Sequence, residues 1–357
     1  MALGFLKKII GSRSRLGVDI GTASIKVAEI DSSDKGPELK NYGYLESYDY
    51  LERANAAFQT STLHLDEENI AFYLRKLMSE AKIGRAPVMA SLPSFSAFTT
   101  LIEVPQLTDE ELSGSMSLHA KQYIPIPISE ATLDWTRVGE RTDAEGVKKL
   151  QIFLISVPNV VIENAKKIFK YADLDLAGIE IEGAGLARSL TSDKKNPALI
   201  IDIGSRSTSI IIAREGHLLF VSQTDFAGGS LTQVIANAMR LSPRRAEDLK
   251  RQRGLAGAGP EQQLSTIIEP IIDVIINESL RAKQNYENTY KSKISEVIVS
   301  GGGANLPGLI KYISGALGMM VSKAQPFDAL AHTSEMNPFI NELGPIFSVA
   351  IGLALKK

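Results

Sequence analysis

Two short segments of the chain share a pattern that suits the binding of phosphate. Residues 18–22 read Val-Asp-Ile-Gly-Thr and residues 201–205 read Ile-Asp-Ile-Gly-Ser, so Asp19 and Asp202 lie 202 − 19 = 183 residues apart. Each segment is followed by a second apolar run, which predicts a β-hairpin with a polar tip. The glycine allows backbone N–H groups to approach an anion, the Thr or Ser hydroxyl adds a donor, and the carboxylate is able to hold Mg²⁺ through its water shell.

Either segment alone is also compatible with an ordinary turn between two strands, because motifs of this length recur by chance. The repetition favours a functional motif over two unrelated turns. Two copies in similar strand contexts, separated by the length of a domain, predict two related halves that face a shared cleft. A hairpin tip from each half would then hold a triphosphate from both sides.

The composition bounds the class of protein. A chain of 357 residues with 44% hydrophobic and 22% charged residues is typical of two or three globular domains. The absence of cysteine excludes disulfides, thiolate metal sites and thiol catalysis, and it favours a reducing cytoplasm. A formal net charge of −2 gives no general attraction to nucleic acid or anionic lipid. The four histidines are too scattered to indicate a zinc site.

The first 15 residues mix apolar and basic side chains, which include Ile9, Ile10, Lys7 and Lys8. This segment predicts either a frayed basic tail or a short stretch that lies on an anionic membrane surface. Its apolar run is too short for a signal peptide. The most apolar helical stretch, residues 344–355, falls short of the ~20 residues that span a bilayer and is expected to be a buried core helix.

Strand and helix patterns alternate along the chain, which predicts an α/β fold. Thr108 and Glu111 form a capping box for a helix that should end near Ile124, before a Pro-Ile-Pro segment. Ser242 with Pro243 predicts the start of a second helix. The other expected elements are strands within 16–44 and at 88–92, 98–104, 132–138, 150–157, 176–181 and 296–299, and helices at 66–82, 228–239 and 261–290.

Three further groups of residues are candidates for chemistry. Gly301, Gly302 and Gly303 follow a predicted strand, where a backbone is able to lie flat against a base or a phosphate, although a tight turn would also need glycine. Glu247 and Lys250 share one helix face, where they would contact a ribose and an adenine ring or else form a surface pair among neighbouring arginines.

Glu182 is the candidate for catalysis. It stands between a predicted strand and a predicted helix, a position from which a carboxylate is able to orient an attacking water in a cleft. Glu180, two residues earlier, competes with it for this role.

Taken in order, these features resemble the actin-like ATPase superfamily: a first phosphate loop, a connecting helix, a second phosphate loop, a ribose-contacting helix and an adenosine turn. Within the superfamily the chain most resembles the type IV pilus assembly PilM family, a relative of the division protein FtsA. FtsA-like proteins usually carry a C-terminal amphipathic membrane helix, which has no counterpart before Lys357, so membrane contact is expected through partners. The resemblance lies in residues 120–125, 228–232, 246–250, 300–309 and 350–355.

The resemblance implies a binding site for ATP and Mg²⁺. It assigns phosphate contacts to Gly21, Thr22 and Lys26 in the first loop and to Gly204, Ser205 and Thr208 in the second. Asp19 and Asp202 would hold Mg²⁺ through water, and Glu247 and Lys250 would contact the ribose and the adenine. Gly301, Gly302 and Gly303 would form the adenosine turn. The resemblance assigns hydrolysis, more weakly, to Glu182. Because Ser209 stands where the first loop has Lys26, cationic help is expected from one side only. Tight ATP binding with slow or negligible hydrolysis follows.

The resemblance also implies the architecture: an α/β fold of two duplicated, actin-like (ribonuclease H-like) lobes around a nucleotide cleft, with a small inserted α+β domain. The expected divisions are a basic tail at 1–15, a first lobe at 16–90 completed by 158–190 and 344–357, an insert at 91–157, a second lobe at 191–239 and 291–343, and a helical subdomain at 240–290.

The function implied is that of a cytoplasmic ATP-binding adaptor at the inner face of the inner membrane, in the assembly of pili for twitching motility. Its expected partners are the N-terminal cytoplasmic peptide of PilN, docked between the insert and the first lobe, and other inner-membrane pilus components, with self-association left open and no nucleic acid. The alternatives are an FtsA-like, membrane-linked division ATPase that polymerises, a competence or secretion-system homologue, and an actin-like fold with an inactive pocket.

Overall fold

The computed structural model describes residues 14–33, 36–47, 66–142, 146–256 and 262–356. Most of the basic segment expected at 1–15 therefore lies outside the described residues. Ser14 and Arg15 already belong to the first strand. No helix in the described part of the chain combines the length and the apolar character needed to cross a bilayer.

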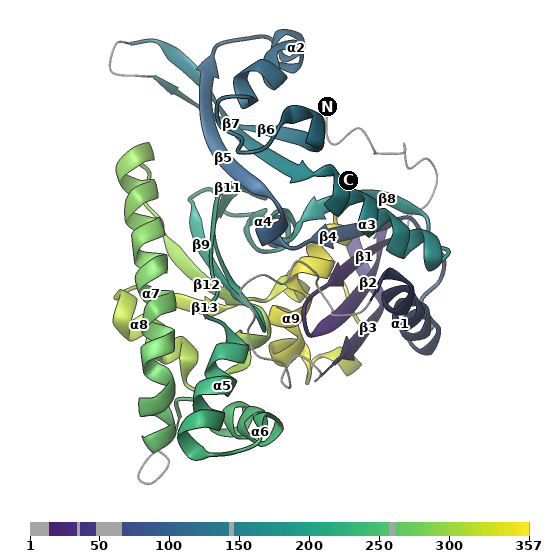
Figure 1. The fold of residues 1–357 in the computed structure, drawn as a ribbon, viewed down its shortest axis with the longest axis vertical. Helices are drawn as coiled ribbons and strands as arrows, with labels where there is room; N and C mark the ends of the chain where they lie inside the picture. Colours follow the sequence, from purple (N-terminus) through teal and green to yellow (C-terminus); the bar gives the residue numbers. More distant parts are fainter. Residues whose placement is uncertain (1–13, 34–35, 48–65, 143–145, 257–261, 357) are drawn as a thin grey trace.

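The first sheet has five strands in the order β3-β2-β1-β4-β8. Strands β1, β2 and β3 are antiparallel neighbours, whereas β4 and β8 run parallel to β1. Helices α1 (Glu67–Glu80) and α3 (Asn159–Tyr171) cover one face (Figure 1). Leu74, Phe169 and Val18 belong to the core between these helices and the sheet. The strands are β1 (Ser14–Ile20), β2 (Ser24–Ser33), β3 (Gly36–Glu46), β4 (Val88–Leu92) and β8 (Leu176–Ile181).

The second sheet repeats this arrangement, with the order β11-β10-β9-β12-β13 and the same strand directions. The register is repeated too, because Asp19 faces Lys26 across the first hairpin and Asp202 faces Ser209 across the second. The predicted duplication is confirmed. The strands are β9 (Ala198–Ile203), β10 (Thr208–Arg214), β11 (His217–Thr224), β12 (Glu296–Ser300) and β13 (Val321–Lys323).

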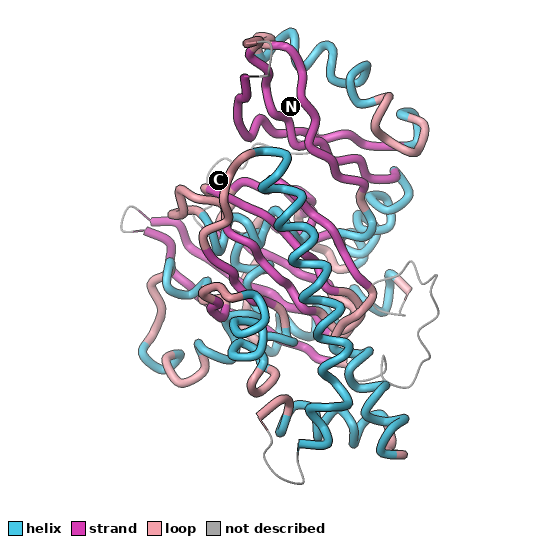
Figure 2. Tube along the Cα trace, turned by 90° about the vertical axis from the view of Figure 1, so that its left-hand side faces the viewer, coloured by secondary structure: helices cyan, strands magenta, loops and turns pink. Residues whose placement is uncertain are grey.

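Four helices belong to the second half of the chain around this sheet. The long helix α7 (Gln262–Tyr290) runs along one face of the sheet (Figure 2), and it continues through Pro270 as a single helix. Helix α8 (Leu309–Leu317) packs beside it. Helices α5 (Gly228–Met239) and α6 (Pro243–Arg253) form the lower end of the molecule in Figure 1, and Ser242 caps α6 as the sequence predicts.

A third sheet, of three antiparallel strands in the order β5-β7-β6, is inserted between β4 and α3. It comprises β5 (Phe98–Pro105), β6 (Ala131–Thr142) and β7 (Lys148–Pro158), with α2 (Asp109–Ala120) packed on it at the top of Figure 1. The predicted capping box is present, since Glu111 N donates to Thr108 Oγ1 at 3.3 Å and Thr108 N donates to Glu111 Oε2 at 2.9 Å. The helix ends at Ala120, four residues earlier than expected.

Two helices cross between the lobes. Helix α4 (Glu182–Thr191) follows β8 of the first sheet but packs on β10 and β11 of the second, whereas α9 (Ile340–Ala354) packs on β1, β2 and β4 of the first sheet. Their backbones meet at two glycines, because a Cβ on Gly352 would lie 1.9 Å from the carbonyl oxygen of Gly185. A Cβ on Gly17 of β1 would lie 1.8 Å from the carbonyl oxygen of Ala350. The two halves are thus joined at contacts that exclude any side chain.

Replacing Gly352 by Ala is expected to lower the free energy of unfolding by about 3 kcal/mol, because the new methyl group has no space and the two helices must move apart. Urea denaturation followed by circular dichroism measures this. Gly315→Ala is the control: Gly315 is exposed in α8, and a Cβ at this position would meet no other atom within 4 Å, so the substitution should stabilise by up to about 1 kcal/mol. Equal effects of the two substitutions on the free energy of unfolding would contradict the interpretation that α4 and α9 approach too closely at Gly352 for any side chain.

Candidate functional site

A cavity of about 540 Å³ lies between the two lobes, and the tips of both repeated hairpins line it. This volume is within the ~300–1,000 Å³ usual for small-molecule sites. The residues expected at the site that line the cavity are Asp19, Gly21, Thr22, Lys26, Glu182, Asp202, Gly204, Ser205, Glu247, Lys250, Gly301, Gly302 and Gly303. The strand order places them together, because β1 and β9 occupy the same central position in the two sheets.

The two aspartates are held in equivalent ways. Lys26 Nζ donates to Asp19 Oδ2 at 2.8 Å, and Ser91 Oγ on the parallel strand β4 donates to Asp19 Oδ1 at 2.7 Å. In the second lobe, Ser300 of β12 lies directly beside Asp202 in the register. Each aspartate therefore has a serine neighbour on the adjacent parallel strand, but only Asp19 has a lysine opposite it in the hairpin.

Negative charge is in excess at this end of the cavity. Burial, together with the charges of Asp19 and Asp202, raises the pKa of Glu182 to about 8, and burial raises the pKa of Asp202 to about 6. Burial alone would lower the pKa of Lys26, but the Asp19 carboxylate keeps it above its ordinary value. A divalent cation would offset the uncompensated carboxylate charge.

The donor set fits Mg²⁺ held through water rather than a fully protein-ligated ion. Within the described ranges, no group of three or more His, Cys, Asp or Glu side chains is arranged to hold a metal ion. Mg²⁺ commonly keeps several waters and takes one or two carboxylates plus phosphate oxygens. Asp19 and Asp202, which line the cavity from opposite lobes, are the residues suited to that role.

Thr208 is not brought to the cavity, in contrast to the expectation that it contacts phosphate. Adjacent residues of a strand point to opposite faces, and Ser209 points to the cleft. The Thr208 side chain is fully buried and donates to the carbonyl oxygen of Phe226 at 2.7 Å. Its counterpart in the first hairpin, 208 − 183 = 25, is Ile25, which is also buried. The register of the hairpin already indicated this orientation. In the second hairpin, the hydroxyls of Ser207 and Ser209 line the cavity beside that of Ser205.

Glu247 and Lys250 form a buried cluster rather than a surface pair. They are 2% and 7% exposed, and Lys250 Nζ donates to Glu247 Oε2 at 2.7 Å, to Thr232 Oγ1 at 2.8 Å and to the carbonyl oxygen of Gly228 at 2.8 Å. Gly228 N in turn donates to the carbonyl oxygen of Gly204 at 3.0 Å. The pair thus fixes the start of α5 against the second hairpin tip while its side chains line the cavity.

Two arginines that the sequence analysis did not propose for the site, Arg206 and Arg251, line the cavity. Arg251 Nε donates to Glu247 Oε1 at 2.7 Å, and its guanidinium also pairs with Glu46 at the end of β3 in the first lobe. Arg206 lies at the second hairpin tip, with its guanidinium carbon 5.4 Å from the centre of the Phe95 ring. Arg206 thus brings a positive charge to the cavity from the second lobe, which the expectation of cationic help from one side only did not include.

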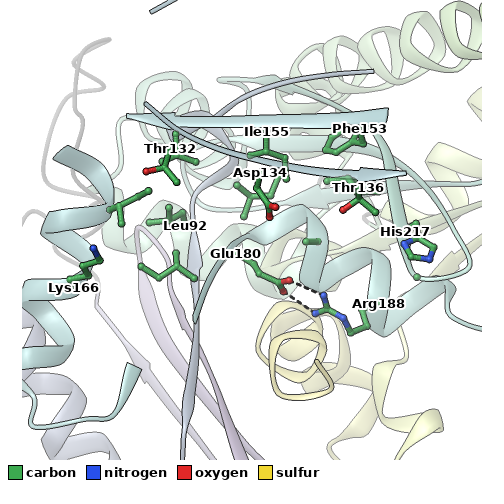
Figure 3. A pocket seen from close by; sticks show the side chains of 17 residues that line it. Leu92, Thr132, Asp134, Thr136, Phe153, Ile155, Lys166, Glu180, Arg188 and His217 are labelled. Carbon is green, nitrogen blue, oxygen red and sulfur yellow. Dashed lines mark hydrogen bonds and ion pairs between the residues drawn. The ribbon is translucent and has the colours of Figure 1, made fainter. Parts of the chain in front are cut away.

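A second cavity, of about 240 Å³, lies beneath the inserted sheet and is lined also by the first lobe and by residues 216–218 of the second (Figure 3). Its walls are mainly apolar, with Phe153 and Ile155 on the sheet side. Opposite them, Arg188 donates to both oxygens of Glu180 at 3.0 Å, and Lys356 also pairs with this carboxylate. Glu180, the competitor of Glu182 for catalysis, therefore faces this second cavity instead of the cleft.

Replacing Glu247 by Gln is expected to cost about 3 kcal/mol of folding stability, because it leaves the Lys250 ammonium buried without its counter-charge. Lys250, Thr232 and Arg251 outweigh burial and lower the pKa of Glu247. Its contribution is therefore full above pH 4.5, the ordinary value, and is lost as the pH falls through the lower folded value. Denaturant titrations of the parent and of Glu247→Gln between about pH 3 and pH 7 measure the difference in the free energy of unfolding.

The matched control for that experiment is Glu278→Gln, which breaks an exposed pair with Arg281. Exposed pairs contribute little, so a change of about 0.5 kcal/mol or less is expected. A Glu247→Gln variant as stable as this control across the pH range would show that the buried cluster is not a structural element of the cleft.

Two solved structures superpose on this chain over almost its whole length. The PilM-PilN type IV pilus biogenesis complex contains a chain that superposes with a TM-score of 0.78 at 23% identity, covering 96% of this chain and 97% of that one. MreB5 of Spiroplasma citri, solved with bound ADP, superposes with a TM-score of 0.55 at 16% identity, covering 95% of this chain and 94% of that one.

Sequence comparison identifies the family. Cell division protein FtsA of Pseudomonas aeruginosa is 24% identical over 275 residues, which are 67% of this chain and 64% of that protein. FtsA of Bacillus subtilis is 25% identical over 58% of this chain, which spans half of that protein. The family described as Type IV pilus assembly protein PilM matches residues 17–357. The chain belongs to the PilM family of type IV pilus assembly proteins.

Proposed function

We propose that this protein is an ATP-binding adaptor of the type IV pilus inner-membrane assembly, placed at the cytoplasmic face of the inner membrane through its partners. The observation that carries the proposal is that matching hairpin tips from the two lobes line one cavity, together with the Glu182 carboxylate and the cationic side chains of Lys26 and Arg206. A separate cavity beside the inserted sheet supplies a place for a peptide partner. An adaptor that responds to a nucleotide needs one site for the nucleotide and one for its partner.

In this proposal the triphosphate lies between the two tips and the nucleoside lies toward Glu247 and Gly301–Gly303. Lys26 and the serine and threonine hydroxyls at the tips would donate to phosphate oxygens. Mg²⁺ would supply positive charge to those oxygens, held through water by Asp19 and Asp202. The bound ADP of the MreB5 structure supports a nucleotide in a fold of this kind.

In this proposal Glu182 would orient a water beside the terminal phosphate. Its carboxylate accepts from Ser94 N at 3.2 Å, which fixes its direction, and it lies at the same end of the cavity as the two aspartates. We propose that hydrolysis is slow or negligible, since an adaptor that responds to bound ATP needs retention of the nucleotide more than turnover.

The second cavity suits an extended peptide. Its apolar walls would take aliphatic side chains, while Thr132, Asp134 and Thr136 of β6 offer polar atoms at its edge. We propose the N-terminal cytoplasmic peptide of PilN as the occupant. The solved PilM-PilN complex supports PilN as the partner for a chain of this family.

Replacing Asp19 or Asp202 by Asn should weaken binding of Mg·ATP about tenfold or more, because each substitution removes one carboxylate from the water shell of the ion. Isothermal titration with ATP at fixed Mg²⁺, repeated in EDTA, measures the metal-dependent part. Asp248→Asn is the control, since Asp248 is exposed on α6 and does not line the cavity. If either cavity variant held Mg·ATP as tightly as the parent, the metal assignment would be wrong.

Replacing Thr136 by Trp should abolish binding of a synthetic PilN N-terminal peptide, because the indole would fill the cavity from the side of the inserted sheet. Thr142→Trp is the matched control on the same strand, since Thr142 does not line the cavity. Fluorescence anisotropy of the labelled peptide gives both affinities. Unchanged binding to Thr136→Trp would place the peptide elsewhere. The same titration with and without Mg·ATP tests whether the nucleotide alters docking, and equal affinities would remove that coupling.

A further inference from the structure

The contact between Arg206 and Phe95 joins the two lobes across the cleft. Arg206 belongs to the tip between β9 and β10 of the second lobe, whereas Phe95 lies in the short 3₁₀ helix η2 (Ser94–Ser96) that follows β4 of the first. Both side chains line the 540 Å³ cavity. The equivalent position of the first tip, 206 − 183 = 23, is Ala23, so this arginine is a feature of the second tip alone.

The position of Arg206 along the cavity indicates which part of a nucleotide it would meet. Phe95 is adjacent to Ser94, whose N–H bonds Glu182, so the contact lies at the carboxylate end of the cavity. The glycine turn 301–303 and the Glu247–Lys250 pair also line the cavity. With a nucleoside at the glycine turn and the phosphates between the two hairpin tips, as in the function proposed above, the terminal phosphate would lie near Arg206.

The segment that carries Phe95 is also a wall of the second cavity. Leu92 lines the peptide cavity, whereas Pro93 and Phe95 line the nucleotide cleft. Beside it, Ile181 lines the peptide cavity and Glu182 lines the cleft. Two short segments, 92–95 and 181–182, joined by the Ser94 to Glu182 hydrogen bond, therefore separate the two sites.

We propose that Arg206 is a binding residue for the terminal phosphate of a nucleoside triphosphate, and that its guanidinium leaves the Phe95 ring to bind this phosphate. A bidentate, charge-assisted bond to phosphate is stronger than a partly exposed cation–π contact, so the guanidinium binds the triphosphate in preference to the ring. A diphosphate ends short of it and leaves the contact with Phe95 in place. The exchange releases the wall segment 92–95 only when the third phosphate is bound, which makes the shape of the peptide cavity depend on the nucleotide present.

The test rests on the proposed nucleotide site and uses the full chain. Affinities for Mg·ADP and for Mg·AMPPNP, a non-hydrolysable triphosphate, are measured by isothermal titration for the parent, Arg206→Ala, Arg206→Lys and Phe95→Leu. Arg206→Ala should weaken Mg·AMPPNP at least tenfold and Mg·ADP less than threefold, with partial recovery in Arg206→Lys. Phe95→Leu should strengthen Mg·AMPPNP two- to fivefold, because the competing ring is gone. Arg245→Ala, an exposed arginine of α6 outside the cavity, controls for the lost charge and should leave the ratio within twofold.

The outcomes separate this inference from the function on which it rests. A parent that binds both nucleotides, with a ratio unchanged by Arg206→Ala, would overturn the inference and leave the nucleotide site intact. A parent that binds neither nucleotide would overturn both. As a second readout, the PilN peptide should bind the parent with different affinities in Mg·AMPPNP and Mg·ADP, and Arg206→Ala should remove that difference while it retains peptide binding. A difference that persists in Arg206→Ala would also count against the proposed exchange.

Discussion

The crossing of α4 and α9 at Gly185 and Gly352 is the contact on which the rest of the structure depends. Each helix packs on the sheet of the opposite lobe, so the two sheets are held by one central pair of helices with no side chain between their backbones. The same tripeptide, Gly-Leu-Ala, occurs at 185–187 and 352–354. Because β1 and β9 are the central strands next to this pair, their hairpin tips open into a single cleft. A shift of one helix along the other would move both tips at once, which is how packed helices permit domain closure.

The local signals of the sequence were sufficient for the elements and for the duplication. The Thr108 capping box, the Ser242-Pro243 helix start and the 183-residue repeat each depend on residues close in the chain or on a repeated pattern, and each is present in the structure. The glycine crossing was not predicted, because Gly185 and Gly352 are separated by 167 residues (352 − 185 = 167). Both lie inside helices rather than in turns, where a requirement for glycine is recognisable from the sequence. Close approach of two helix backbones is a property of the packed lobes, and no spacing along the chain encodes it.

The cleft shows the same division between local and distant information. Residues that lie within the repeated hairpins could be placed from their pattern, except where strand alternation turned Thr208 into the core. The partners of the cavity residues come from other elements: Ser91 of β4 donates to Asp19 in the first hairpin, and Glu46 of β3 pairs with Arg251 of α6. Arg206 was missed for a different reason. A long charged side chain in a turn is usually solvated. The orientation of the Arg206 side chain depends on Phe95, which belongs to the opposite lobe.

The thin wall between the two cavities limits how strongly they are able to influence each other. The wall is fixed to the crossing helices, because Arg188 of α4 donates both to Glu180, beside the second cavity, and to the carbonyl oxygen of Gly352 at 2.7 Å. On the cleft side it is held by the Ser94 to Glu182 bond and by one cation–π contact. The exchange proposed above removes the cation–π contact and leaves the Ser94 to Glu182 bond in place. Such a contact contributes about 0.5–1 kcal/mol, which lies at the lower limit of the ~1–3 kcal/mol typical of coupling between sites. The bound nucleotide should therefore change the affinity for a peptide by about two- to fivefold rather than switch it on or off.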